Sequence, residues 1–173
     1  ISPVGNTVAD AWASILAGKS GVGRVTHFDA SDLPVRIAAE VKGFNAEDWM
    51  PSKDVKKMDT FIHYGMAAAI QAIEDAGLGD NEADAERIGV AIGSGIGGLP
   101  GIERTRDSFV DGGARKISPF FVPACIINMV AGNLAIRYGF QGPNVAIVTA
   151  CTSATHNIGE AARMIAYGDA DVM

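Results

Sequence analysis

The sequence predicts an α/β fold in which helices alternate with strands that pair in parallel. Three observations lead to this prediction. Apolar, β-branched runs at 88–93 and 144–150 have the length of buried strands. Predicted helices follow both runs. The chain of 173 residues, 48% apolar and 20% charged, has enough material for a sizeable core.

The N-terminal elements follow in order from caps and spacing. A helix is predicted at 6–18, NTVADAWASILAG, with Asn6 or Thr7 as the cap and Gly18 at its end. After a turn-rich segment, the weak alternation of VRIAAEV at 35–41 predicts a short strand. The segment 59–76, closed by Gly77, keeps its few polar side chains on a restricted arc, which predicts a mostly buried helix.

The later elements are expected to repeat strand, turn and helix. The strand at 88–93 leads through glycines to a polar helix at 101–110, and an apolar helix is predicted from Val122 to Tyr138, broken by Gly139. After the strand at 144–150 comes a helix whose apolar positions are Ile158, Ala161, Ala162, Ile165 and Ala166. DADVM at 169–173 resembles the start of another strand. A chain that begins and ends inside such a pattern is expected to be a fragment.

The net charge and the cysteine content argue against several classes of function. A net charge of −6 and a pI near 4.9 argue against a nucleic-acid binder, which needs a basic surface to replace phosphate counterions. Cys125 and Cys151 form no CxxC pair, so neither a disulfide framework nor a zinc site is expected. We expect no resident cofactor, and a reducing cytoplasm is the simplest compartment.

The charge-free segment 117–136 has the length of a membrane-spanning helix. It contains two prolines and two asparagines. Amide groups without a hydrogen-bond partner are unfavourable in the hydrocarbon core of a membrane. The segment is therefore predicted to be a buried or interface helix.

The glycine segment 93–101, GSGIGGLPG, contains a formal GxGxxG at Gly93, Gly95 and Gly98, after a strand and before a helix. No second apolar strand ending in an acidic residue follows, as a dinucleotide site would require. A structural turn near a site is the favoured interpretation, with nucleotide binding as the alternative.

Charged and titratable side chains offer further candidates. Lys53, Lys56 and Lys57 share one face if their segment is helical, either as a solvated face or as a docking patch for an acidic protein. His156 follows Cys151 by five residues, which rotates it about 140° around a helix and makes it a poor general base. His27 and His63 have no local partner pattern, so structural roles are expected.

The two cysteines receive different interpretations. Cys125 lies in an apolar segment and is expected to be buried. Cys151 lies where a strand is followed by a helix, whose positive N-terminal end favours a thiolate and whose free amides stabilise an oxyanion. Glycines two residues to either side, as in a hydrolase elbow, are absent. On these grounds alone, a nucleophile and a small packing residue remain equally open for Cys151.

Several motifs resemble the β-ketoacyl-acyl carrier protein synthases, condensing enzymes of fatty-acid synthesis with a thiolase fold. TACTSATHNIGEAARMIAYGDADVM resembles their nucleophile segment, and the remaining matches, in order, are ISPVGNTV, KKMDTFIHYG, GVAIGSGIGGLPGIE and RKISPFFVPACIINMVAGNLAIRYG. The resemblance covers essentially the whole chain. It implies a thiolase-like layered αβαβα architecture, of which residues 1–173 form the N-terminal part, trimmed at both ends.

The resemblance also implies roles for individual residues. Cys151 would accept the acyl group from an acyl carrier protein, with its own amide as an oxyanion donor, before malonyl carrier protein loses CO₂ and its carbanion attacks the acyl-enzyme. Ile96 would line the acyl pocket, and Phe121 would reach the neighbouring subunit's pocket. The catalytic histidines, a lysine and the second oxyanion donor would lie beyond Met173, so this chain alone is expected not to catalyse condensation.

The resemblance further implies partners. Lys53, Lys56 and Lys57 would face the acidic acyl carrier protein, and the segment 122–138 would belong to the interface of a homodimer. The alternative is a non-catalytic, synthase-like scaffold or carrier-protein-binding subunit. Retention of Cys151 argues against it, because a silent subunit has no need of a reactive thiol.

Overall fold

The computed structural model describes residues 1–78 and 84–173. The chain divides into two compact units, Ile1–Asn45 and Ala46–Met173. The second contains the predicted strands and the candidate site.

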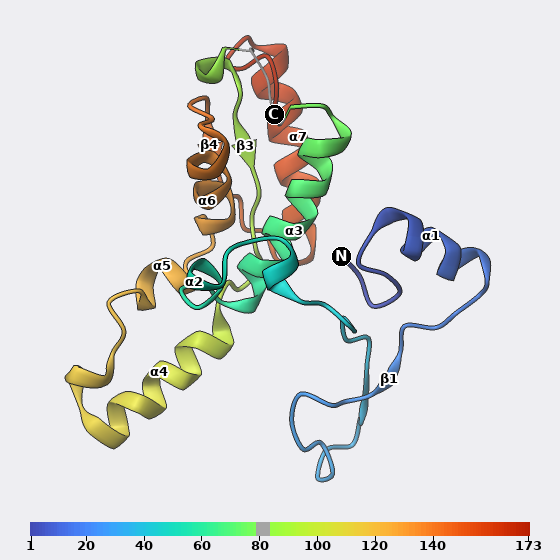
Figure 1. Ribbon diagram of the computed structural model, residues 1–173, viewed down its shortest axis with the longest axis vertical. Helices are drawn as coiled ribbons and strands as arrows, with labels where there is room; N and C mark the ends of the chain where they lie inside the picture. The colour runs from blue at the N-terminus through green and yellow to red at the C-terminus, as the bar shows by residue number, and fades with distance from the viewer. Residues whose placement is uncertain (79–83) are drawn as a thin grey trace. The chain divides into compact units, whose positions relative to one another are not determined.

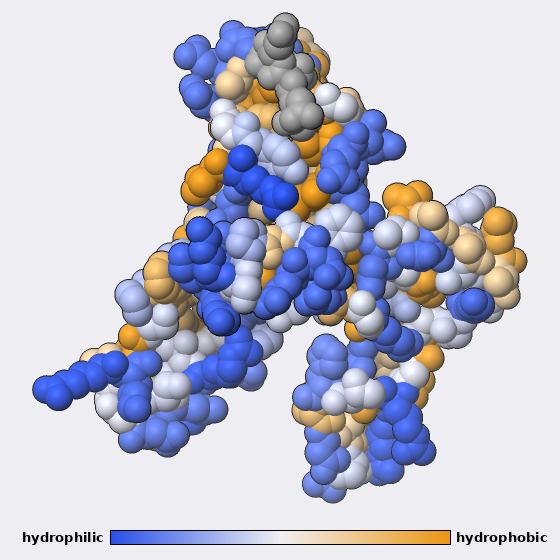
Figure 2. Space-filling model, viewed as in Figure 1, coloured by the Kyte–Doolittle hydropathy of each residue, from blue (hydrophilic) through white to orange (hydrophobic). Residues whose placement is uncertain are grey.

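The first unit holds one of the predicted helices and a small β-ribbon. Helix α1 (Val8–Leu16) begins after Thr7, whose hydroxyl accepts a 3.1 Å hydrogen bond from the Asp10 amide. Its apolar side chains stay at the surface (Figure 2), Val8 being 81% exposed. Strand β1 (Gly23–Arg24) pairs antiparallel with β2 (Ile37–Ala38), which confirms the short strand predicted there.

The second unit opens with short helices before the long buried one. These are η1 (Ala46–Asp48), α2 (Ser52–Val55) and α3 (Thr60–Asp75). The prediction for α3 is confirmed, since Gly77 adopts a φ of +66° behind it and five of its side chains are buried: Ile62, Met66, Ala67, Ile70 and Ile73.

The sheet of this unit is parallel, as predicted. Strand β3 (Val90–Ala91) pairs with β4 (Asn144–Val145), with Val90 opposite Asn144, and Figure 1 shows the two side by side. Ile88 forms a further parallel bridge with Val172, where the last strand was expected to begin. The segment is held there by Arg87, at the end of η2 (Ala85–Arg87), which lies 2.7 Å from the Asp171 carboxylate.

Both strands are shorter than predicted. The ladder of β4 ends before Ile147, whose N–H and C=O are bound by the Asn157 side chain at 3.2 and 3.0 Å. At Ile147 a side chain thus takes the place that a neighbouring strand would have.

The single helix predicted over 122–138 is wrong. The structure has α5 (Phe121–Cys125) and α6 (Met129–Tyr138), with an extended residue at Ile126 between them. The helix cannot continue because its carbonyls are used elsewhere. Those of Ala124 and Cys125 accept from the Asp59 and Gly98 amides at 3.3 and 2.9 Å. Gly139 ends α6 with a φ of +72°, as predicted.

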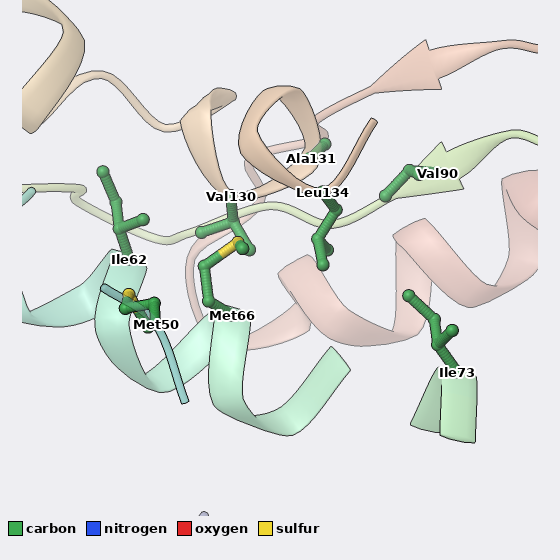
Figure 3. Close-up of a cluster of buried hydrophobic side chains, with 8 residues drawn as sticks. All are labelled: Met50, Ile62, Met66, Ile73, Val90, Val130, Ala131 and Leu134. Atoms are coloured by element: carbon green, nitrogen blue, oxygen red, sulfur yellow. The ribbon is translucent and has the colours of Figure 1, made fainter. Parts of the chain in front are cut away.

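The core lies between α3, α6 and β3 (Figure 3). Its cluster comprises Met50, Ile62, Met66, Ile73, Val90, Val130, Ala131 and Leu134. Ile62 and Leu134 are 0% and 1% exposed. Helix α7 (Ser153–Ala166) contacts β3, which runs between α6 and α7 in Figure 1.

The remaining elements complete the connection between β3 and α5. Helix α4 (Leu99–Gly112) spans the predicted polar helix, and Figure 2 shows mostly hydrophilic side chains over it; η3 (Ala114–Lys116) follows. Over the two described ranges, no helix combines the length and apolar character needed to cross a bilayer.

Candidate active site

Cys151 lies in the turn that joins the strand segment to α7, as the order of elements predicted. It is the middle residue of η4 (Ala150–Thr152), and α7 begins at Ser153 without an intervening loop. Its side chain is exposed. A thiol at the start of a 14-residue helix is accessible to a reagent and lies at the positive end of the helix dipole.

The backbone immediately before the thiol is strained. Ala150 has a φ of +53°, in the left-handed region that residues with a Cβ rarely occupy. Such a conformation costs on the order of 1–3 kcal/mol and persists only where its surroundings fix it. It turns the chain sharply, so that Cys151 projects from the turn.

The Ser153 side chain makes hydrogen bonds to the backbone at and just before this strained residue. Its hydroxyl accepts from the Thr149 amide at 3.0 Å and donates to the Ala150 carbonyl at 2.7 Å. The side chain is 6% exposed, and both of its bonds close on the turn itself. Ser153 therefore holds the N–H of the residue before the left-handed Ala150 and the C=O of Ala150 itself.

Asn157 makes hydrogen bonds to the backbone on both sides of the Cys151 turn. Its amide nitrogen donates to the Ile147 and Ser153 carbonyls at 3.0 and 2.7 Å, and its oxygen accepts from the Ile147 amide at 3.2 Å. Asn157 is 4% exposed. One buried side chain thus binds both the end of the strand segment and the first turn of α7.

The Cys151 amide is free to act on a ligand. Within the described ranges, its N–H makes no hydrogen bond, whereas the Thr152 amide donates to the Thr149 carbonyl at 3.1 Å. A free N–H beside a nucleophilic sulfur has the chemistry of an oxyanion donor.

The glycine segment packs against this turn. A Cβ on Gly93 would lie 2.2 Å from the Ile147 carbonyl oxygen and 2.7 Å from the Asn157 amide nitrogen. A Cβ on Gly95 would be 3.6 Å from the Ala150 oxygen, and Gly97 has a φ of +78°. Close backbone approach and left-handed geometry account for these glycines, in agreement with the predicted structural turn near a site.

The predicted acyl-pocket residues lie on two different segments. Ile96 is 70% exposed. It follows Gly95, which packs close to Ala150, so its segment lies beside the Cys151 turn. Phe121 begins α5 and lines a separate cavity of about 210 Å³ together with Lys56, Lys57 and Cys125. The Gly98 to Cys125 hydrogen bond joins the two segments.

The three lysines are exposed but only partly helical. Lys53 lies in α2 and Lys56 caps it, whereas Lys57 lies beyond the helix and 3.7 Å from the Asp54 carboxylate. The Lys57 ammonium also lies 5.1 Å from the centre of the Phe120 ring.

The histidines make local contacts. His63 Nε2 lies 3.0 Å from the Val55 carbonyl, and His156 Nδ1 lies 2.5 Å from the Thr149 hydroxyl. Over the described residues, neither is hydrogen bonded to Cys151. His27 donates its backbone N–H to Glu40 in the first unit.

Cys125 is buried, as predicted, and its environment disfavours the reactive thiolate. It is 8% exposed, and burial, followed by the negative charge of Asp59, raises the pKa of its thiol. Asp59 is itself buried and pairs with Arg104 at 3.2 Å. The two cysteines therefore differ in both access and environment.

Sequence reasoning missed Ser153 and Asn157. The available signal was a pair of polar residues four positions apart at the start of α7, which places them on one face. Asn and Ser at a helix start are usually interpreted as caps, so their long-range bonds to 147–150 were not anticipated.

Comparison with known proteins gives a consistent result. Residues 1–173 match the family described as "Beta-ketoacyl synthase, N-terminal domain". The chain is 60% identical over its full length to 3-oxoacyl-[acyl-carrier-protein] synthase 2 of Vibrio cholerae, of which it covers 42%.

Solved structures agree on the fold. A β-ketoacyl synthase from Burkholderia phymatum is 26% identical with a TM-score of 0.79, and the chain covers 42% of it. The ishigamide ketosynthase/chain length factor has a TM-score of 0.87 at 23% identity, with 43% covered. Each alignment includes 98% of this chain. The chain thus spans less than half the length of these relatives, and its thiolase-like α/β architecture is that of ketosynthases.

Proposed function

Because the chain belongs to the β-ketoacyl synthase family, we propose that it is the nucleophile-bearing part of a 3-oxoacyl-[acyl carrier protein] synthase that elongates fatty acids. One structural observation carries the proposal. Cys151 is exposed on a strained turn at the start of α7, next to its own unpaired amide. That arrangement suits a nucleophile attacking a carbonyl carbon.

In the proposed first step, the Cys151 thiolate attacks the thioester carbonyl of an acyl carrier protein. A carbon–sulfur bond forms to Cys151, the carbon–sulfur bond to the carrier breaks so that the carrier leaves as a thiolate, and the Cys151 amide hydrogen bonds the transient oxyanion. In the second step, malonyl carrier protein loses CO₂ and its C2 carbanion attacks the acyl-enzyme carbonyl. A carbon–carbon bond forms, Cys151 leaves as thiolate, and the product is a 3-ketoacyl carrier protein.

Ile96 and Phe121 are proposed to line the path of the acyl chain. Ile96 offers an exposed apolar side chain on a segment beside the nucleophile turn, which supports the assignment. Phe121 is proposed to act in the partner subunit of a homodimer. Exposed apolar side chains nearby support such an interface, with Val122 57% and Ile136 78% exposed. A cytoplasmic location is proposed because the two cysteines of the sequence give no disulfide framework.

The acyl carrier protein is proposed to dock on Lys53, Lys56 and Lys57. Over the described ranges, the side-chain ammonium groups of Lys53 and Lys56 make no ion pair and no hydrogen bond, so their charges are available. Replacing both with Glu is expected to raise KM for the acyl carrier protein about tenfold with kcat little changed, because complementary charge governs encounter. Steady-state kinetics at low and high salt measure this, and the effect should shrink as salt screens it.

A matched control separates docking from net charge. Lys19→Glu together with Arg24→Glu makes the same change in charge on exposed residues of the first unit. This pair should leave KM near its original value. An equal rise in KM for both pairs would contradict the docking assignment.

The proposal requires that Cys151 react and Cys125 not. Iodoacetamide at pH 7.5 is expected to alkylate Cys151 at least about tenfold faster than Cys125, because burial and Asp59 raise the pKa of Cys125 and disfavour its thiolate. The sign follows directly: as pH rises, the Cys125 rate should increase only above the ordinary thiol range. Peptide mass spectrometry over a time course measures both rates.

The alkylation result distinguishes the proposed enzyme from the non-catalytic alternative. Equal inertness of both cysteines would favour the alternative, a non-catalytic subunit that binds carrier protein. Selective labelling should be followed by incubation of the intact protein with an acyl carrier protein bearing a labelled acyl group. The proposed function predicts that label on the peptide containing Cys151, and its absence there would refute acyl transfer.

A further inference from the structure

We propose that Ser153 and Asn157 are positioning residues that fix Cys151 for attack; together they are called the turn clamp. They act through the backbone and do not touch the substrate. For turnover, the inference rests on the proposed function, whereas for thiol reactivity it rests only on the geometry of the turn.

Most of the clamp's hydrogen bonds reach backbone groups of residues 147–150, in the turn before the nucleophile. Ser153 binds the Thr149 amide and the Ala150 carbonyl, and Asn157 binds both backbone groups of Ile147. Thus peptide groups from 147 to 150 are held by side chains rather than by a neighbouring strand. The orientation of the Cys151 amide and sulfur is set by these bonds.

The clamp holds the strained backbone at Ala150. A left-handed alanine relaxes unless its neighbours hold it, and the Ala150 carbonyl accepts a 2.7 Å hydrogen bond from Ser153. Asn157 in turn holds Ser153, since it donates to the Ser153 carbonyl at 2.7 Å. The two residues therefore form one connected unit around the strained peptide.

The turn clamp is buried. Both side chains are almost fully buried, although both are polar and α7 is otherwise largely exposed. A buried polar side chain is favourable only when its hydrogen bonds are satisfied, and here the partners are backbone groups of the turn. Because Gly93 packs on the same Asn157 amide, the clamp also fixes the segment that carries Ile96.

The experiment compares Asn157→Ala and Ser153→Ala with Leu134→Ala in the intact protein. Leu134→Ala disturbs the core without touching the turn, so it reports loss of stability alone. In the folded fraction of either clamp variant, alkylation of Cys151 should be at least about tenfold slower, because misplacement of a reacting group by about 1 Å costs up to ~100-fold. Their kcat should fall by a similar factor with KM for acyl carrier protein unchanged. Leu134→Ala should change neither rate.

The outcomes are distinguishable from failure of the proposed function. Slower alkylation in the clamp variants, with no condensation by the otherwise unchanged full-length synthase that contains this chain, would support the clamp and refute the function. Normal alkylation and kcat in a folded clamp variant would overturn the clamp. If Asn157→Ala does not fold, Ser153→Ala carries the same test, since it removes both hydroxyl bonds while alanine favours the helix.

Discussion

Replacing Cys151 with serine is expected to lower kcat/KM for condensation by at least about 10³-fold, because a hydroxyl is a far weaker nucleophile unless a base activates it. The described residues provide no base that is hydrogen bonded to position 151 and could activate a serine there. His156, the nearest imidazole in sequence, is occupied by the Thr149 hydroxyl. The measurement is formation of 3-ketoacyl product from acyl and malonyl carrier proteins by the intact protein.

Cys125→Ser is the matched control. It exchanges the same atoms at the buried cysteine, which lies on α5 and is quiet in the proposed mechanism. Its kcat/KM should stay within a few-fold of the original. If Cys151→Ser retained a tenth of the activity, or if Cys125→Ser abolished it, the assignment of the nucleophile would fail.

Leu134→Ala is expected to lower the free energy of unfolding by about 2–5 kcal/mol, the range for truncating a buried leucine. Leu134 is 1% exposed and lies in the cluster between α3, α6 and β3, so its removal leaves a cavity that rigid neighbours cannot close. Denaturant unfolding of the intact protein, followed by the shift of the midpoint at constant slope, measures the loss.

Ile136→Ala, two residues along the same helix, provides the comparison. Ile136 is 78% exposed, so truncation should change stability by less than about 0.5 kcal/mol unless another surface covers it. A small loss at Leu134 together with a larger one at Ile136 would show that the core lies elsewhere. The same pair of variants therefore also reports on the proposed subunit interface.

The sequence predicted those elements whose signals are local. Gly18, Gly77 and Gly139 ended helices as expected, since each adopts the left-handed geometry that glycine accommodates. The parallel pairing followed from the alternation of strands and helices, and the place of Cys151 in the turn before α7 followed from the order of these elements. Periodicity and terminal residues are sufficient for such features.

The errors arose where distant groups compete for backbone hydrogen bonds. The helix break at 126–128 depends on the Gly98 and Asp59 amides, and neither lies near α5 in sequence. The early end of β4 depends on Asn157, whose type suggests a cap or a turn. No local pattern contains these pairings, so the length of the strand and the turn clamp became visible only in three dimensions.

The hydrogen bond from Gly98 to Cys125 bears on how substrate range could change during evolution. It joins the segment of Ile96 to the helix that begins at Phe121. An insertion or deletion in either segment would shift one partner of this bond and open the junction at Asp59, where a Cβ on Gly98 would already lie 3.1 Å from the aspartate side chain. Exchanges of side-chain size at 96 and 121 leave the backbone in register. If Ile96 and Phe121 have the roles proposed for them, a change in acyl-chain preference would therefore be reached by resizing side chains on a fixed frame.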